Sequence, residues 1–190
     1  MAKVKIQGHA SGTGILTVTA PDTDENRTIT LPDATGTLLN SDGDGSSLTG
    51  INGSAFKALA VSASFSAVTA TKVQFSDEQF DVNGDYDSAT NYRFTPTVAG
   101  YYHFDITLDV RGTASLYQST VYLYKNGSSL GYGSKKSDEV PHWISFSTLE
   151  PANGTSDYFE VYVYSSLTSP SYEESSDGDC TFSAHWARSL

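Results

Sequence analysis

The sequence has one cysteine, few basic residues and no long apolar run, and each shortage excludes a class of protein. Because Cys180 is the only cysteine among 190 residues, one chain holds no intrachain disulfide and no cysteine-based zinc site. Eleven basic residues against 22 acidic ones give a formal net charge of -11, which disfavours nucleic-acid binding through a basic surface. No stretch approaches the roughly 20 apolar residues that span a bilayer, so we expect no membrane insertion. The start, MAKVKIQGHASG, has basic residues but no apolar run after them, so we expect no signal peptide and synthesis in a cytoplasm.

Aromatic and turn-forming residues, in contrast, are plentiful. Aromatic side chains make up 12% of the chain, with twelve tyrosines and a single methionine, and such side chains fit a pleated strand better than a helix. Sixteen glycines and many Ser, Thr, Asn and Asp residues supply turns. Alternating apolar and polar residues predict about eight strands, at residues 63–68, 71–75, 91–97, 100–110, 119–127, 143–150, 157–166 and 180–188. This pattern predicts an all-β protein of two packed antiparallel sheets with very little helix.

The sequence changes character near residue 55. Residues 1–54 contain two short strand-like runs, at 14–20 and 27–31, but too few large apolar residues to bury a core alone. We expect this segment to be ordered only within an assembly, with disorder as the alternative. Residues 55–190 are denser in large apolar side chains, and we predict that they form a single head domain.

Alternating acidic residues in the head region raise the question of a calcium loop. The residues at every second position are Asp81, Asn83, Asp85 and Asp87. An EF-hand loop requires Gly at its sixth position and Glu at its twelfth, and counting from the first of these aspartates both positions hold tyrosine. DGDG at 42–45 fails in the same way, because its twelfth position is Gly53. We therefore expect solvated turn carboxylates here, with no bound metal or cofactor.

A specific string of aromatic residues and glycines follows these carboxylates. It reads GDYD at 84–87 and YRFTPTVAGYYHFDI at 92–106. Its companions in consistent order are ASFSA at 63–67, KVQF at 72–75, VYLYKNG at 121–127, YFEVYVY at 158–164 and TFSAHW at 181–186. Over residues 57–190 the chain resembles the globular head of complement's first component, subunit q, and its relatives in the tumour necrosis factor superfamily. The resemblance implies a jelly-roll β-sandwich that assembles as a threefold homotrimer, and it leaves an axial calcium ion open as an alternative.

The N-terminal part has a second resemblance. Residues 12–51, and TITLPDATGTLL within them above all, resemble short segments of bacteriophage tail fibre and neck proteins. A short β-rich fibre segment before a complement-type head implies a virion protein: a trimeric tail fibre or tip. Its first 54 residues are then expected to dock on the tail or baseplate, and its head to contact a host surface glycan or protein. A capsid or neck decoration protein with a purely structural role is the alternative.

The sequence also supports trimerisation independently of the resemblance to complement-type heads. Two of the predicted strands contain more tyrosines than the solvent face of a monomer requires. Tyrosine suits an interface because it combines a large contact area with a hydroxyl group that can remain hydrated. We therefore predict a trimer interface at Tyr122, Tyr124, Tyr158, Tyr162 and Tyr164. A half-exposed stack of tyrosines across one sheet is the alternative.

Receptor contacts are expected in loops, because loops carry binding on rigid sandwiches. Two predicted loops, at 131–143 and 169–179, combine aromatic and charged residues. The candidates are Tyr132, Lys135, Lys136, His142, Trp143 and Tyr172, with Glu173 and Glu174 beside them. An exposed aromatic ring stacks on a sugar ring, so we expect a glycan receptor to bind there. Trp143 packed inside as the first residue of a strand is the alternative, and we assign Trp186 to the core.

Catalysis has little support in the sequence. A surface-polysaccharide depolymerase needs two suitably placed carboxylates. The available glutamates, Glu139, Glu150, Glu160, Glu173 and Glu174, follow no recognisable pattern. The four histidines include no i,i+4 pair for metal binding, and neither G-x-S-x-G nor a phosphate loop is present. We therefore expect no enzyme activity, with the depolymerase as the alternative.

Overall fold

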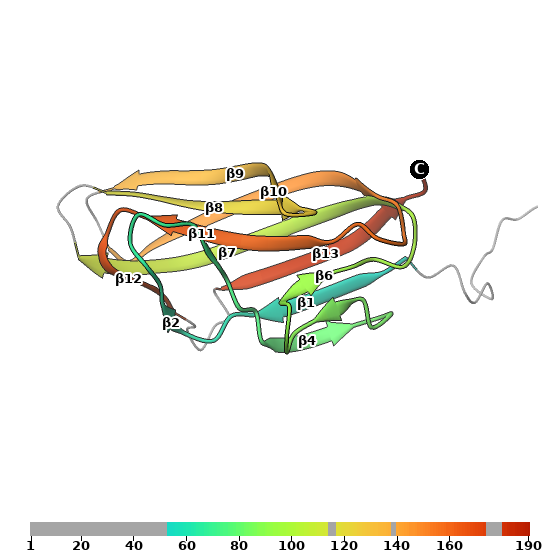
Figure 1. Ribbon diagram of the computed structural model, residues 1–190, viewed down its shortest axis with the longest axis horizontal. Coiled ribbons are helices and arrows are strands. Elements are labelled where there is room, and N and C mark those ends of the chain that lie inside the picture. The colour runs from blue at the N-terminus through green and yellow to red at the C-terminus, as the bar shows by residue number, and fades with distance from the viewer. Residues whose placement is uncertain (1–52, 114–116, 138–139, 174–179) are drawn as a thin grey trace, which may run out of the picture. The chain divides into compact units, whose positions relative to one another are not determined.

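The computed structural model describes residues 53–113, 117–137, 140–173 and 180–190, which form two antiparallel sheets packed face to face (Figure 1). No helix forms in these four ranges, and hence they contain none that is long and apolar enough to cross a membrane. The predicted all-β jelly-roll sandwich is confirmed for the head. The fibre segment predicted over residues 1–54 lies outside the described residues, apart from Gly53 and Ser54.

Sheet A has seven strands, with β7 at its centre. Its order is β2 (Ala63–Ser64), β12 (Thr168–Tyr172), β7 (Gly100–Thr113), β13 (Thr181–Arg188), β1 (Ala55–Leu59) and β4 (Asp77–Asp81). The seventh strand, β10 (His142–Ala152), pairs with β7 along residues 100–110. Because β13 pairs with the same part of β7, β10 and β13 occupy its two opposite edges.

Sheet B has six strands and carries most of the tyrosines considered below. Its order is β5 (Tyr86–Asp87), β6 (Arg93–Phe94), β11 (Phe159–Ser165), β8 (Tyr117–Lys125) and β9 (Ser128–Ser137). The short strand β3 (Thr71–Lys72) pairs with β11 beyond the point where β6 ends. Asn126-Gly127, predicted as a turn, connects β8 to β9, and both residues have positive φ.

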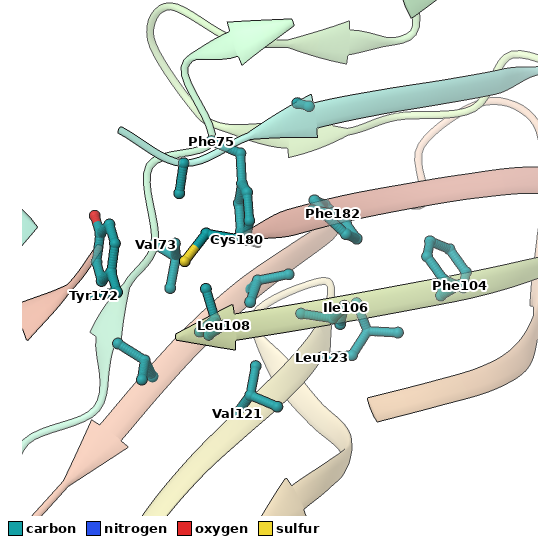
Figure 2. Close-up of a cluster of buried hydrophobic side chains, with 14 of the residues drawn as sticks. Val73, Phe75, Phe104, Ile106, Leu108, Val121, Leu123, Tyr172, Cys180 and Phe182 are labelled. Carbon is teal, nitrogen blue, oxygen red and sulfur yellow. The ribbon is translucent and has the colours of Figure 1, made fainter. Parts of the chain in front are cut away.

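The core lies between the two sheets and follows the period-two alternation of the strands. Along β7, Tyr102, Phe104 and Ile106 are buried, whereas the alternate residues Tyr101 and Asp105 are partly or fully exposed. Figure 2 shows side chains from both sheets meeting in one cluster, in which β8 contributes Val121 and Leu123. Burial of these apolar side chains supplies the main stabilising free energy of the sandwich.

Aromatic rings dominate one end of this core. The Phe56 ring stacks on Tyr86 and Phe94, each with a centroid distance of 4.5 Å, and meets Phe182 edge-on at 4.9 Å. The Tyr86 hydroxyl donates a hydrogen bond to the Phe75 carbonyl oxygen at 2.9 Å, and burial raises its pKa. The ring therefore stays protonated and satisfied inside the sandwich.

Trp186 packs at the edge of the core and is only partly buried. Its Nε1 donates to the Ala99 carbonyl oxygen at 3.2 Å. A Cβ atom at Gly100 would lie 2.1 Å from this nitrogen, and one at Gly53 would lie 2.4 Å from the Trp186 Cβ. The core assignment made from the sequence is thus confirmed in part, because the indole covers the core and leaves one side in solvent.

Five strands were not predicted, namely β1, β4, β5, β9 and β12, and several predicted strands are much shorter. β9 has the sequence SSLGYGSKKS, with hardly any apolar residue, and β12 contains Pro170. Neither shows the alternation from which a strand is predicted. Conversely, the strands predicted at 63–68 and 71–75 shorten to two residues each, β2 and β3, at the edges of their sheets.

Two glycines explain how β9 packs into the sandwich although its sequence has hardly any apolar side chains. A Cβ atom at Gly133 would lie 2.2 Å from the Ser145 carbonyl oxygen of β10, and one at Gly131 would lie 2.7 Å from the Phe146 ring. The inward face of β9 therefore packs directly against β10, on backbone at Gly133 and on the Phe146 ring at Gly131, and neither glycine position has room for a side chain. The sandwich closes along this side.

Candidate functional site

Four tyrosines from three strands lie together on the outward face of sheet B. We call this set the tyrosine band, and its members are Tyr122 and Tyr124 of β8, Tyr132 of β9 and Tyr162 of β11. The side chain of Tyr132 is 61% exposed, and the other three are half-buried. Tyr164 of β11 and Tyr158, which directly precedes this strand, are also half-buried.

The register of the strands aligns the band. Tyr162 pairs with Tyr122, and Tyr122 pairs with Tyr132, so three rings stand in one row across β11, β8 and β9. Lys72 of β3 pairs with Tyr162 and extends the row to a fourth strand. With neighbouring strands about 4.8 Å apart, this row spans about 14 Å.

The rings of the band contact one another. Tyr124 and Tyr162 lie 4.3 Å apart between centroids, Tyr122 and Tyr132 lie 5.7 Å apart, and Tyr122 meets Tyr124 edge-on at 6.2 Å. Such contacts add to the stability of each pair and restrict the rotamers of the rings. The band is therefore a preformed aromatic surface, and its continuity depends on Tyr122.

Charged side chains border the band. Lys72 Nζ forms an ion pair with Glu160 Oε1 at 2.5 Å and lies 6.0 Å from the centre of the Tyr162 ring. The guanidinium group of Arg93 lies 4.7 Å from the centre of the Tyr158 ring, within cation–π range. Burial and the neighbouring Glu160 raise the pKa of Tyr162, so its phenol stays protonated.

The structure places the predicted trimer-interface tyrosines and one predicted receptor residue on the same surface. Tyr122, Tyr124 and Tyr162 were expected at a trimer interface and Tyr132 in a receptor loop, yet their rings are in contact. This contact was not predicted, because β9 was not recognised as a strand. The role of these tyrosines in a trimer stays a prediction.

Two of the predicted receptor contacts are wrong because their side chains are buried. His142 is 1% exposed, and its Nδ1 lies 2.9 Å from the Tyr117 hydroxyl. Burial, and then the charge of Lys135, lowers the pKa of His142 to about 4, although Asp109 opposes the change. Tyr172 is 3% exposed and belongs to the core cluster (Figure 2). Both residues lie in strands, β10 and β12, in which they point inward.

The remaining receptor candidates are exposed, but they lie on strands and not in a loop. Lys135 and Lys136 belong to β9, as does Tyr132, and Lys136 pairs with Gln118 of β8. Trp143 is the second residue of β10 and is 53% exposed, so the alternative of a packed Trp143 is wrong. It lies on sheet A, whereas the tyrosine band lies on sheet B.

The outward face of sheet A has a different chemistry. His103 Nδ1 lies 3.1 Å from Asp105 Oδ2, and its Nε2 is hydrogen-bonded to Ser147 Oγ at 3.0 Å. The His185 ring lies 5.3 Å away between centroids, and Leu149 on the neighbouring strand is 50% exposed. This face combines imidazole, carboxylate and hydroxyl groups with isolated apolar side chains.

The alternating acidic residues serve as hydrogen-bond acceptors in turns. The Asp81 carboxylate accepts three backbone N–H groups, that of Tyr86 at 2.7 Å. Asp87 likewise accepts three, and these bonds, that from Thr90 first, lower its pKa to about 2. Asp85 is 5% exposed, so the prediction of solvated carboxylates is wrong for this residue. Within the described ranges no three His, Cys, Asp or Glu side chains are grouped to hold a metal ion.

The glutamates considered for catalysis do not converge on one place. Glu160 pairs with Lys72 on sheet B, and Glu173 Oε2 lies 3.0 Å from Arg111 Nη1 on sheet A. Glu150 accepts a hydrogen bond from the Thr148 hydroxyl at 3.0 Å. Glu139 and Glu174 lie outside the described residues.

No family model and no curated protein matches the sequence, whereas several solved structures share the fold. The globular domain of the zebrafish complement 1qA protein is 19% identical, with a TM-score of 0.55, over 72% of this chain and 99% of its own. Murine APRIL at pH 8.5 is 12% identical, with a TM-score of 0.51, over 71% of this chain and 99% of its own. These likenesses confirm the complement-type and tumour-necrosis-factor-like fold of the head and show the fold alone. The tail-fibre resemblance stays a prediction.

Proposed function

We propose that this chain is a homotrimeric bacteriophage virion protein, a tail fibre or tip whose head binds the surface of the host cell. The tyrosine band is the observation that carries the proposal. A continuous, partly exposed aromatic surface on a rigid sheet is the kind of feature that marks an interaction site, because single exposed apolar residues are common but contiguous ones are not. The N-terminal segment, residues 1–54, would dock on the tail or baseplate.

The positions of the glutamates and of the aromatic residues support a binding role for the head. The described residues bring the candidate catalytic glutamates to separate places, each with its own polar partner, while the aromatic residues converge. A homotrimer would present three such surfaces on one particle. Three linked weak sites gain about 10² to 10⁴ in avidity without any new contact.

Adsorption of fluorescently labelled full-length protein to host cells tests the proposal. We expect the labelled protein to bind cells and to reduce adsorption of the virus when it is added in excess. Sedimentation at micromolar concentration should give the mass of a trimer. A trimer that neither adsorbs nor competes would instead support the decoration role, and a stably folded monomer would contradict both.

A further inference from the structure

We propose that the tyrosine band, with Arg93 and Lys136 at its two ends, binds a polysaccharide that carries carboxylate groups. This assignment rests on the proposed function and names the class of partner for the same surface. Three properties of the surface support it: the aromatic platform, its length, and the sign of the charges beside it.

The platform suits sugar rings. A pyranose has apolar C–H faces and a rim of hydroxyl groups, and a tyrosine ring offers an apolar face with a polar tip. In the band, ring contacts between 4.3 and 6.2 Å hold the side chains in place before any ligand arrives. Tyrosine loses little conformational entropy on binding, so a prearranged set of rings binds at low cost.

The length of the row suits a chain and not a single sugar. Lys72, Tyr162, Tyr122 and Tyr132 occupy one row across four strands, which spans about 14 Å. The outward face of a flat sheet has no walls, so it accommodates a polymer that continues past both ends of the row. Polar side chains lie on one side of the row. Ser134 lies between Tyr132 and Lys136 on β9, and it accepts a hydrogen bond at 3.2 Å from Gln118, which pairs with Lys136.

The charges favour an acidic partner. The acidic side chains near the band are already engaged: Glu160 by Lys72, and Asp87 by three backbone N–H groups. Arg93 and Lys136, in contrast, form no ion pair with any described residue. In a chain with a net charge of -11, this face offers two cations that have no acidic partner among the described residues, and a guanidinium group matches a carboxylate in bidentate geometry.

A second copy of the chain is a poorer occupant. The ion pair of Lys72 and Glu160 directly borders the tyrosine band, and interface cores are depleted of charged residues. A hydrated polysaccharide leaves such a pair in contact with water. A protein surface that covered it would have to desolvate both charges.

Affinity electrophoresis of the full-length protein tests the assignment, with alginate as the acidic polysaccharide and dextran as the neutral one. We expect alginate to retard the protein, dextran to retard it at least tenfold less, and added salt to weaken the retardation.

The double variant Tyr122→Ala/Tyr162→Ala should raise the apparent dissociation constant for alginate at least tenfold. Because that variant loses ring contacts, Tyr132→Ala and Arg93→Gln/Lys136→Gln serve as milder variants, each expected to weaken binding several-fold. Phe80→Ala, an exposed aromatic in β4 at the far edge of sheet A, is the matched control and should bind as the parent does.

Three results would overturn the proposal: no retardation by alginate, equal retardation by both polymers, or equal losses in the band variants and in Phe80→Ala. Sedimentation of the tyrosine variants separates a self-association surface from a glycan site. If Tyr132→Ala lowers the mass of the oligomer, the band is an interface between copies and the proposal is wrong. Failure of the proposed function is distinct, because a protein that is retarded by alginate but does not adsorb to host cells contradicts only the cellular role.

Discussion

The two sheets of the head have similar inward faces and different outward faces. Inside, both contribute fully buried phenylalanines, such as Phe104 and Phe182 of sheet A and Phe159 of sheet B, which pack ring against ring. Outside, sheet A presents His103 and small hydroxyl side chains, while sheet B presents touching tyrosine rings. The inward faces follow from the fold, since any sandwich needs an apolar core. The outward faces are free to differ, so the difference between them carries the information about function.

The largest expected effect tests whether inward-facing and outward-facing aromatic rings contribute differently to the free energy of unfolding. Phe182 is fully buried and contacts the rings of Phe56, Phe75, Tyr86 and Phe104. Phe182→Ala should lower the free energy of unfolding by about 3–5 kcal/mol, because it removes a large buried ring and leaves a cavity. Tyr132→Ala, on the outward face, should change it by about 0.5 kcal/mol or less. Urea denaturation measures both, and similar losses would mean that the outward ring is part of the folding core.

A smaller effect is expected where the two sheets close against each other. Gly133→Ala would place a Cβ atom 2.2 Å from the Ser145 carbonyl oxygen, so β9 has to move away from β10. We expect a loss of about 1–3 kcal/mol in the free energy of unfolding, as for other overpacked sites. Ser129→Ala, an exposed position on the same strand, is the control and should be nearly neutral. If Gly133→Ala leaves the free energy of unfolding unchanged, β9 packs less tightly against β10 than the distance to the Ser145 carbonyl oxygen implies.

The packing of β9 against β10 also explains physically why some strands were predicted from the sequence and β9 was not. Strands that alternate apolar and polar residues, such as β7 and β11, were predicted nearly to their ends, because alternation reflects one buried face. β9 buries glycines against backbone, which leaves no apolar signal in its sequence. The prediction of the candidate site was affected most. Tyr132 joins the band only through the pairing of β9 with β8, and the pairing of strands is not visible in one sequence.

The pH dependence of stability distinguishes a buried histidine from the exposed ones on sheet A. Burial lowers the pKa of His142 to about 4, so the unfolded chain, with an ordinary pKa of about 6.5, binds the proton more readily. The stabilisation is therefore complete above pH 6.5 and is lost as the pH falls toward 4, by about 1.4 kcal/mol for each pH unit within that window. His142→Asn, which keeps an acceptor for Tyr117, should flatten this slope between pH 6.5 and 4.5. His185→Asn, at an exposed site, should retain it, and an unchanged slope in His142→Asn would assign the effect to other groups.

A loss smaller than that at Phe182 is expected at Glu160, the carboxylate that borders the tyrosine band, and it sharpens the contrast between the two outward faces. Glu160→Gln removes the charge that pairs with Lys72. The side chains of Lys72 and Glu160 are only 29% and 8% exposed, so solvent screens the pair in part. Because the amide oxygen of Gln still accepts a hydrogen bond and Lys72 Nζ also donates to the Asn91 carbonyl oxygen at 3.0 Å, the loss should be about 1 kcal/mol. Its effect on binding should be larger and of opposite sign. With Lys72 released from its partner, the band gains a third unpaired cation, and retardation by alginate should increase several-fold while that by dextran stays the same. An unchanged response to alginate at low salt would mean that the sugar faces alone are recognised, and that charge takes no part in distinguishing this sheet from the other.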